Sequence, residues 1–421
     1  MSAEEQLLRA ARGAEVSGDR ERARALYREA LGAAGAAGAA AVGLARLDLE
    51  AGRADDVIAG LDLVRHDRVP PEQLAEFFLL RAGAFRLRGQ AAEEGEALQS
   101  ALSADPYCWP ALLRKAQILE QRGEMRAAAV LYRDVLKISP PSEFRSPGHR
   151  EALDHAQRLV DQYAEALEAT LLEAIKDLPG LSQRWRESVS IVSGRTRPFL
   201  SQCNQLTVPR LPAQPFFRRE MFDWVPRFEQ YTDVIRDEML AALGDAGDDF
   251  KPYVQYQPGE PVNQWAELNH SRQWTSFHLY QAGKPVEANL ARCPGTAEAL
   301  RLVDAVHLAG TCPNAMFSVL APKSHIPPHH GESNARLVAH LPLVVPDGCL
   351  FRVGYDARRW NEGEVIIFDD TIEHEAWNDS DQLRVVLIFD VWNPLLAVEE
   401  RAIVQHIAAA ERRFRLGLDA G

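Results

Sequence analysis

Two patterns of apolar and polar positions divide this chain. The first 140 residues are rich in Ala, Leu, Arg and Glu, which favour helices, and the helical pattern continues from Glu151 to Leu178. Beyond Tyr253, apolar residues gather in short β-branched or aromatic runs separated by turn signals such as VPDG, NEGE and NDSDQ. These patterns predict an α + β protein of two domains, with helices over residues 1–178 and strands over residues 221–421.

The helical region repeats at a fixed spacing. Gly18 recurs as Gly52, and Gly89 recurs as Gly123, each 34 positions further on. A small residue at an inter-helix turn and a proline after the second helix, at this period, are typical of tetratricopeptide repeats. The unit that matches this pattern best is marked by Trp109, Leu112, Ala116, Gly123, Ala128, Tyr132, Leu136 and Pro140.

The repeat predicts an α-helical tetratricopeptide solenoid, because a single helix pair cannot bury its apolar face alone. The step from Gly52 to Gly89 is 37 residues, which indicates a short insertion near HDRVPPEQ. The alternative is a plain helical bundle that happens to show the spacing. Repeat arrays bind a peptide or protein in a concave groove or serve only as supports, so a polypeptide partner is the expectation here.

The rest of the chain predicts a connecting segment and a β domain. Residues 179–220 are Pro-rich and aperiodic, which indicates a linker or an extended segment. A short helix is expected from Trp224 to about Leu243. Short strands without intervening helices follow, as in a sandwich or a jelly roll. The strand-like runs cover residues 315–322, 335–345, 349–355, 364–370 and 383–392.

Composition narrows the classes of partner and compartment. The net charge is −13, whereas a nucleic-acid-binding protein needs a basic face, so no nucleic-acid partner is expected. No apolar run approaches the roughly 18 residues of a membrane span, and the acidic N-terminus does not have the form of a signal peptide. The five cysteines include no C-x-x-C pair, which suits a reducing compartment. We expect a cytoplasmic protein without a membrane span, and the sequence predicts no oligomeric state.

The candidate chemistry lies in the histidines of the β domain. His325, His329, His330 and His340 lie around the second strand-like run, and His374 follows the run EVIIFDD at a turn. Imidazole is the commonest protein ligand of iron, zinc, nickel and copper. Two histidines from distant strands of one sheet can meet at the mouth of a barrel, so His329 and His374 are candidate ligands for a metal.

A carboxylate ligand is harder to place. Non-haem iron oxygenases commonly hold the metal with two histidines and one carboxylate, and the first histidine and the acid form H-x-D or H-x-E. The triplet from His329 to Gly331 has glycine where the acid would stand, whereas the triplet from His330 to Glu332 keeps an acid. The spacing alone leaves both triplets open.

Three longer blocks resemble one protein family. IPPHHGESNARLVAHLPLVVPDGC, WNEGEVIIFDDTIEHEAWND and LRVVLIFDVWNP contain the elements P-H-x-G, R-L-x-x-H-L, F-D-D-x-x-E-H-E-x-W and D-V-W-x-P in order. They resemble the aspartyl/asparaginyl β-hydroxylases over about residues 255–400, and a tetratricopeptide region precedes this domain in some members. The resemblance implies a C-terminal double-stranded β-helix, a cupin-like jelly roll, that uses Fe(II), 2-oxoglutarate and O2.

The resemblance also implies which residues hold the iron. The first iron-ligating histidine of the family is that of P-H-x-G and matches His329, and the second matches His374. Two places after the first histidine the family has glycine, as at Gly331. The resemblance therefore implies two protein ligands for the iron and no ligand role for His330 or Glu332.

Further residues match the family's cosubstrate site. Arg384 matches the arginine that pairs with the C5 carboxylate of 2-oxoglutarate, Ser318 matches a serine that helps to hold it, and His340 matches a histidine near the cosubstrate. Many members have an arginine two residues before that histidine, where this chain has Val338. Arg336 shares the strand face of Val338 and His340, so it is the candidate substrate contact.

The acidic residues near His374 also have a structural interpretation. Asp369, Asp370 and Glu373 can cap the turn and orient His374 as readily as they can act on a substrate. We expect no catalytic side chain beyond the metal and cosubstrate residues.

The resemblance implies hydroxylation of the β-carbon of Asp or Asn in a peptide or protein, with succinate and CO2 as coproducts. One alternative keeps the oxygenase core but changes the substrate to a small molecule, a carrier-bound substrate or a ribosomal peptide. Another is a catalytically inactive tetratricopeptide scaffold, against which the retention of His329, His374 and Arg384 counts.

Overall fold

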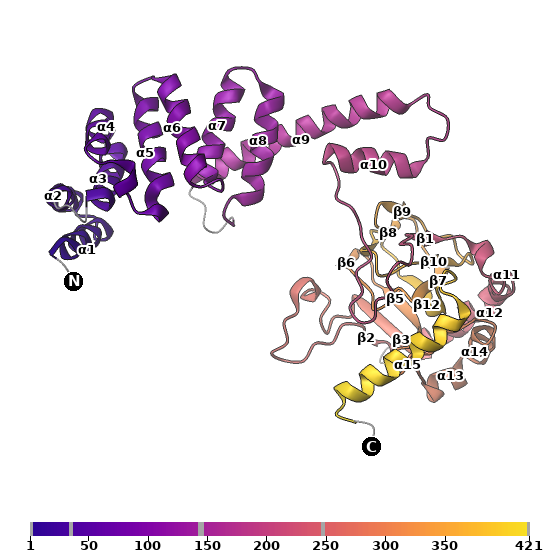
Figure 1. The fold of residues 1–421 in the computed structure, drawn as a ribbon. Coiled ribbons are helices and arrows are strands. Elements are labelled where there is room, and N and C mark those ends of the chain that lie inside the picture. Colours follow the sequence, from indigo (N-terminus) through magenta and orange to yellow (C-terminus); the bar gives the residue numbers. More distant parts are fainter. Residues whose placement is uncertain (1–2, 33–36, 142–146, 246–248, 419–421) are drawn as a thin grey trace. The chain divides into compact units, whose positions relative to one another are not determined.

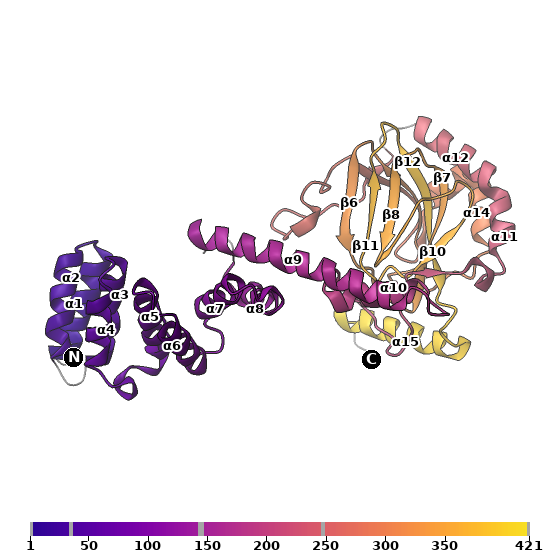
Figure 2. The same cartoon turned by 90° about the horizontal axis from the view of Figure 1, so that it is seen from above.

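The structure, a computed structural model, divides into two compact units, residues 1–197 and 198–421 (Figures 1 and 2). It describes residues 3–32, 37–141, 147–245 and 249–418, so the predicted outer domain limits at residues 1 and 421 lie outside the described residues. The two units are described separately below.

The first unit is built from helix pairs whose connecting turns contain glycine. Gly18, Gly52, Gly89 and Gly123 have φ between 71° and 82°. A β-carbon added at any of them would meet nothing within 4 Å, so the left-handed backbone conformation, and not a lack of space, favours glycine there. The paired helices are α1 (Ala3–Val16), α2 (Arg20–Leu31), α3 (Ala37–Glu50), α4 (Ala54–Asp62), α5 (Leu74–Leu87), α6 (Ala91–Ala104), α7 (Trp109–Gln121) and α8 (Met125–Ile138).

Separate apolar clusters lie between neighbouring helices of this unit. Tyr27 and Leu44 belong to one cluster, and Phe77 belongs to the next. The short helices η1 (His66–Arg68) and η2 (Pro71–Gln73) occupy the insertion that interrupts the 34-residue period. Clusters shared only between neighbours are the arrangement of a repeat solenoid, and the predicted helical repeat region is confirmed.

Two further helices complete the first unit. They are α9 (Pro147–Ile175) and α10 (Gln183–Ser193), which pack on each other. The presence of α10 corrects the expectation that residues 179–220 are a linker or extended throughout. The α10 stretch contains no proline and buries Val189 and Ser193, which lie four residues apart on one helix face.

Within its described residues, the second unit contains two antiparallel β-sheets. The larger has the strand order β1-β10-β7-β12-β5-β3-β2, with β4 paired to β3, and the smaller has the order β6-β11-β8-β9. This confirms a C-terminal domain of antiparallel strands. The strands are β1 (Phe216–Phe217), β2 (Lys251–Pro252), β3 (Trp274–Gln281), β4 (Lys284–Pro285), β5 (Ala315–Leu320), β6 (Ser324–His329), β7 (Arg336–Val344), β8 (Cys349–Val353), β9 (Asp356–Arg358), β10 (Ile366–Phe368), β11 (His374–Asn378) and β12 (Arg384–Trp392).

The second unit begins upstream of the predicted boundary at residue 221. Strand β1 pairs with β10, where Phe216 lies opposite Phe368. Further upstream, the hydroxyl oxygens of Ser201 and Thr371 are 2.6 Å apart. The aperiodic segment therefore adds an edge strand and a side-chain contact to the sheet domain.

The larger sheet has two apolar faces. On β7, Leu337 and Leu341 face away from the smaller sheet and pack with Phe228 and Met239. These two residues lie in the helices Val225–Phe228 and Thr232–Asp245. Val338 packs inward with residues of the smaller sheet such as Phe351. Because side chains alternate across a strand, the inward set of β7 also includes the polar residues at positions 336 and 340, which line a cavity.

Short helices accompany the sheets. The described residues contain no helix that is long and apolar enough to cross a membrane. The helices of this unit are η4 (Arg219–Met221), α11 (Val225–Phe228), η5 (Glu229–Tyr231), α12 (Thr232–Asp245), η6 (Asn263–Trp265), α13 (Glu287–Arg292), α14 (Pro294–Leu300) and α15 (Val398–Arg415).

Candidate active site

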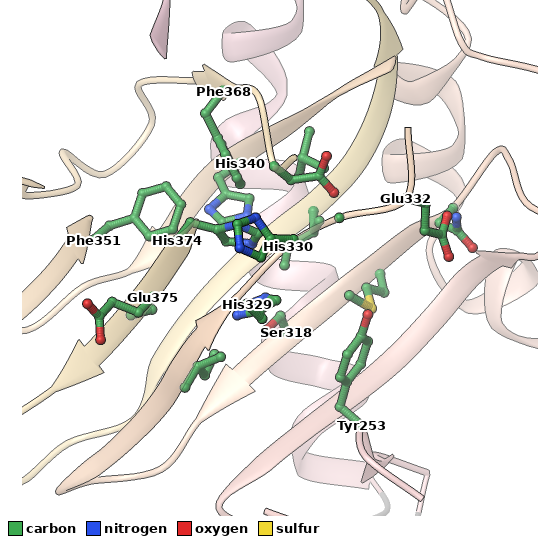
Figure 3. A pocket seen from close by; sticks show the side chains of 18 of the residues that line it. Tyr253, Ser318, His329, His330, Glu332, His340, Phe351, Phe368, His374 and Glu375 are labelled. Carbon is green, nitrogen blue, oxygen red and sulfur yellow. The ribbon is translucent and has the colours of Figure 1, made fainter. Parts of the chain in front are cut away.

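Two histidines meet across a strand pair of the smaller sheet. His329 ends β6, His374 begins β11, and the two are opposite each other in the antiparallel ladder. Their ring centroids are 4.0 Å apart (Figure 3). Although 45 positions separate them in the sequence, the register of one ladder brings their side chains together.

Backbone carbonyls fix the proton on each of these rings. The Nδ1 atom of His329 is 2.8 Å from the carbonyl oxygen of Pro327, and that of His374 is 3.1 Å from the carbonyl oxygen of Ile372. A carbonyl only accepts, so Nδ1 carries the hydrogen and Nε2 keeps its lone pair. Burial lowers the pKa of His329 to about 4, and burial lowers the pKa of His374 well below its usual value. Both rings are therefore neutral at pH 7, which is the form that binds a metal.

Gly331 has no room for a side chain. A β-carbon there would overlap the carboxylate of Asp370, and the Gly331 N–H donates to the Asp370 carbonyl at 2.7 Å. The acid of an H-x-D pattern therefore does not fit behind His329. Nearby, His330 Nδ1 is 3.0 Å from the Thr371 carbonyl oxygen. The described residues contain no group of three or more His, Cys, Asp or Glu side chains placed to hold one metal ion.

Arg384 provides a buried positive charge near the histidine pair. It begins β12, is 1% exposed, and lies over the ring of Trp360 at 4.9 Å. Its Nε and Nη1 atoms are buried without a hydrogen-bond partner. Burial lowers the pKa of Arg384 to about 10. Since a buried cation without partners is costly, the site fits an anionic ligand.

Ser318 and His340 line the same cavity as Arg384. The hydroxyl oxygen of Ser318, fully buried on β5, accepts a hydrogen bond from Trp274 Nε1 at 3.0 Å. The Nδ1 atom of His340 is buried without a partner, and burial, followed by the charge of Arg384, lowers the pKa of His340 well below its usual value. The structure thus brings the predicted metal and cosubstrate residues to one place.

The cavity has a volume of about 350 Å³. Figure 3 shows the rings of His329, His374 and His340 gathered in it, with Glu332 to one side. Aromatic and aliphatic side chains form much of the remaining wall. They are Tyr253, Trp265, Trp274, Met316, Ile326, Val338, Phe351, Phe368, Ala376 and Ile388.

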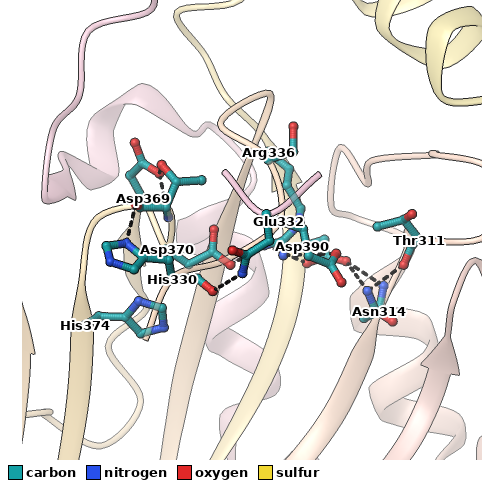
Figure 4. A network of polar contacts seen from close by, with 12 residues as sticks. Thr311, Asn314, His330, Glu332, Arg336, Asp369, Asp370, His374 and Asp390 are labelled. Atoms are coloured by element: carbon teal, nitrogen blue, oxygen red, sulfur yellow. Dashed lines mark hydrogen bonds and ion pairs between the residues drawn. The ribbon is translucent and has the colours of Figure 1, made fainter. Parts of the chain in front are cut away.

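Arg336 also lines the cavity but is surrounded by acids (Figure 4). Its Nη1 atom lies 2.9 Å from a carboxylate oxygen of Asp370 and 3.4 Å from one of Asp390, and its Nη2 atom lies 3.5 Å from Glu332. Asp390 in turn accepts from the backbone N–H of Asn314 at 2.7 Å and from its side chain at 3.0 Å. Burial raises the pKa of Asp370 to about 7.

Sequence reasoning did not anticipate this acidic cluster. One signal was available, because Asp390 interrupts the otherwise apolar run VVLIFDVW and has the same parity as Arg384. Asp369, by contrast, lies in the turn, where it accepts the backbone N–H of Thr371 at 3.0 Å. Glu373 lies 3.1 Å from Arg352.

The chain is similar in sequence to known hydroxylases. A family model described as aspartyl/asparaginyl β-hydroxylase matches residues 229–394. The aspartyl/asparaginyl β-hydroxylase of Mus musculus is 34% identical over 204 residues, which are 45% of this chain and 25% of that protein. The ornithine lipid ester-linked acyl 2-hydroxylase of Rhizobium tropici is 31% identical over 220 residues, 48% of this chain and 71% of that protein. The chain therefore spans about a quarter of the mouse relative.

Among solved structures, a thermophilic TPR protein of Thermus thermophilus is similar to part of this chain. It is 19% identical, covers 46% of this chain and 100% of its own length, and has a TM-score of 0.31, which is a weak likeness.

Proposed function

Since the chain belongs to the aspartyl/asparaginyl β-hydroxylase family, we propose that it is an Fe(II)- and 2-oxoglutarate-dependent dioxygenase. Its substrate would be an Asp or Asn residue in a peptide or protein, hydroxylated at the β-carbon. One cavity supports this proposal, because it holds both a histidine pair whose Nδ1 atoms are bound to backbone carbonyls and Arg384, whose Nε and Nη1 atoms have no hydrogen-bond partner.

The residues present fit an iron ion. His329 and His374 would hold it through Nε2, because their Nδ1 hydrogens are bound to backbone carbonyls. Few protein ligands leave positions for a bidentate oxo acid and O2, and the lack of room beside Gly331 keeps a third protein ligand out. When bound, iron and 2-oxoglutarate supply the oxidising power that inserts one oxygen atom from O2 into a C–H bond, with release of succinate and CO2.

The protein's own part is to bind and orient the cosubstrate. The free N–H groups of Arg384 would donate to the C5 carboxylate of 2-oxoglutarate. Because Trp274 donates to the Ser318 oxygen, the Ser318 hydroxyl hydrogen is free to point at the same carboxylate. The unpartnered Nδ1 of His340 offers another polar contact. The aromatic wall, including Phe351 and Phe368, would exclude water from the reacting atoms.

The two facing sheets support a double-stranded β-helix as the fold of this domain, with the site between them. For the repeat unit, residues 1–197, we propose a separate role, in which its helix pairs bind the polypeptide substrate. Loss of residues 1–197 should then raise the Michaelis constant for a protein substrate more than that for a short peptide. An equal change for both would reduce the repeats to a support.

The proposed function is tested by anaerobic titration of the protein with Fe(II) and 2-oxoglutarate. The chelate should give a weak visible charge-transfer band, and His374→Ala should abolish both this band and succinate release. His406→Ala is the matched control, because His406 is on α15 and bonds its own helix carbonyl at Ala402. If wild type gives no band and no succinate, the chain is the inactive scaffold instead.

A further inference from the structure

The cavity contains two arginines in opposite electrostatic surroundings. On the inner face of the larger sheet, Arg384 begins β12, whereas Arg336 begins β7 opposite Trp392, at the end of β12. The two guanidinium groups therefore come from opposite ends of the same strand pair. Arg384 has buried N–H groups free for an anion, while Arg336 is paired with acids of this chain.

The acids around Arg336 outnumber its charge. Asp370, Asp390 and Glu332 lie within 3.5 Å of its Nη atoms. Arg336 and Asp370 are each only 5% exposed. Even when the Asp370 carboxyl is protonated, two carboxylates face one guanidinium and leave a surplus of negative charge, and the neighbouring residue on this face, Val338, is apolar. A carboxylate that entered here would be a fourth acid beside one cation, which is strongly unfavourable in a desolvated site.

Both a donor and an acceptor remain unused at this end of the cavity. The Nε atom of Arg336 and the Oδ1 atom of Asp370 are buried and have no hydrogen-bond partner. Each such group left unsatisfied costs free energy. A carboxylate can only accept and an ammonium group can only donate, whereas a primary carboxamide has one acceptor oxygen and two N–H donors.

We propose that the Arg336–Asp370 end of the cavity binds a primary carboxamide, so that the enzyme acts on an asparagine side chain and rejects aspartate. The amide oxygen accepts from Arg336, and the amide N–H groups donate to Asp370 and its neighbouring acids. This inference rests on the proposed hydroxylase function and narrows its substrate class.

The first test compares three peptides that differ only in one side chain, Asn, Asp or Lys. With the full chain, Fe(II), 2-oxoglutarate and O2, kcat/KM for the Asn peptide should exceed that for the Asp peptide by roughly 100-fold. Oxidation is measured as the gain of one oxygen by mass spectrometry. An equal or higher value for the Asp peptide overturns the inference, and so does a preference for Lys, which would indicate a cationic substrate.

Peptide binding to the metal-free chain, measured by calorimetry, gives the inference its own readout. Tighter binding of the Asn peptide than of the Asp peptide is expected without any turnover. This separates the two proposals. A chain that binds Asn selectively but never consumes 2-oxoglutarate would contradict the hydroxylase function alone, whereas a chain that consumes 2-oxoglutarate but prefers Asp would contradict the inference alone.

A second test changes the charge of the pocket by Val338→Arg. Val338 is buried between Arg336 and His340 on the same strand face, opposite Asp390. The added cation should reduce the preference for Asn over Asp by at least about tenfold, mainly by raising kcat/KM for the Asp peptide. Val338→Met is the matched control, because it adds length without charge. If both variants shift the preference equally, charge is not the cause and the inference fails.

Discussion

Two buried charged side chains, one in the repeat unit and one in the sheet unit, differ in whether they have partners within the protein. In the repeat unit, Asp48 is 1% exposed and accepts from Arg24 at 2.6 Å and from Arg53 at 2.7 Å. In the sheet unit, Arg384 is equally buried, yet two of its nitrogens have no partner. Paired charges inside a helix stack hold neighbouring helices together, whereas an unpaired charge inside a sheet domain lowers stability unless a ligand completes it. We therefore expect Asp48 to stabilise the fold of its unit and Arg384 to bind an anionic ligand.

The largest effect is expected for Arg384→Met. Loss of the guanidinium should lower the affinity for 2-oxoglutarate by roughly 1000-fold, because an anion would then be buried without a positively charged partner. The melting temperature of the ligand-free protein should stay the same or rise, since the Nε and Nη1 atoms have no hydrogen-bond partner to lose and the contact removed is that with the Trp360 ring. Calorimetric titration and thermal unfolding check the two parts. A lower melting temperature with unchanged affinity would show that Arg384 serves the fold.

The next largest effect is expected for Gly331→Ala. The added β-carbon overlaps the Asp370 carboxylate and displaces the strand end that carries His329, so peptide turnover should fall roughly 100-fold. Gly60→Ala is the matched control in the repeat unit, because a β-carbon there meets nothing within 4 Å. It should leave turnover unchanged and raise helix stability by up to about 1 kcal/mol. Equal turnover in the two variants would contradict the steric argument.

Asp48→Asn tests the repeat side of the comparison. The change removes the charge that pairs with Arg24 and Arg53 while keeping the side-chain shape. The free energy of unfolding of the repeat unit should fall by about 2–3 kcal/mol, as followed by far-ultraviolet circular dichroism in urea. Consumption of 2-oxoglutarate without peptide should not change. A variant as stable as wild type would show that these pairs contribute little.

The smallest effect is expected for Ser318→Ala. The hydroxyl would supply one hydrogen bond to the cosubstrate carboxylate, so the Michaelis constant for 2-oxoglutarate should rise roughly tenfold. The Trp274 N–H also loses its acceptor, and this adds a small loss of stability. Ser324→Ala is the control, because its hydroxyl bonds the Pro322 carbonyl. A Michaelis constant unchanged by Ser318→Ala would remove this residue from the cosubstrate site.

The sequence predicted those parts of the fold that depend on backbone conformation and burial within one short segment. The inter-helix glycines followed from their spacing, because each turn needs a left-handed residue at the same place in every repeat. The runs that became β5, β7, β10 and β12 are rich in apolar residues because both faces of these strands are largely covered, whereas β8 buries only alternate residues.

The two strands that carry the histidine pair, β6 and β11, were not predicted from the sequence. Strand β6 has the sequence SHIPPH, and its two prolines are tolerated because β6 lies at the edge of the smaller sheet. Strand β11, HEAWN, is short and polar because its residues face the cavity and Arg352. Residues that line the cavity thus interrupt the apolar alternation by which a strand is recognised in a sequence.

The acidic cluster also could not be read from the chain. Shared parity placed Arg336, Val338 and His340 on one face, and all three line the cavity. The partners Asp370 and Asp390 come from a turn and from another strand, so their contacts depend on how three separate segments pack. The family resemblance suggested Arg336 as a substrate contact, but it did not indicate that acids of this chain pair with the Arg336 guanidinium.

The ladder position of His329 and His374 has a consequence for how the sequence can vary. Their spacing is set by hydrogen bonding between β6 and β11 and not by the length of chain between them. Insertions in the intervening loops, such as that before β10, can therefore accumulate without moving either ring. A single residue gained or lost inside β6 or β11 would turn one imidazole to the opposite face. Descendants of this chain are thus free to lengthen their loops but not these two short strands.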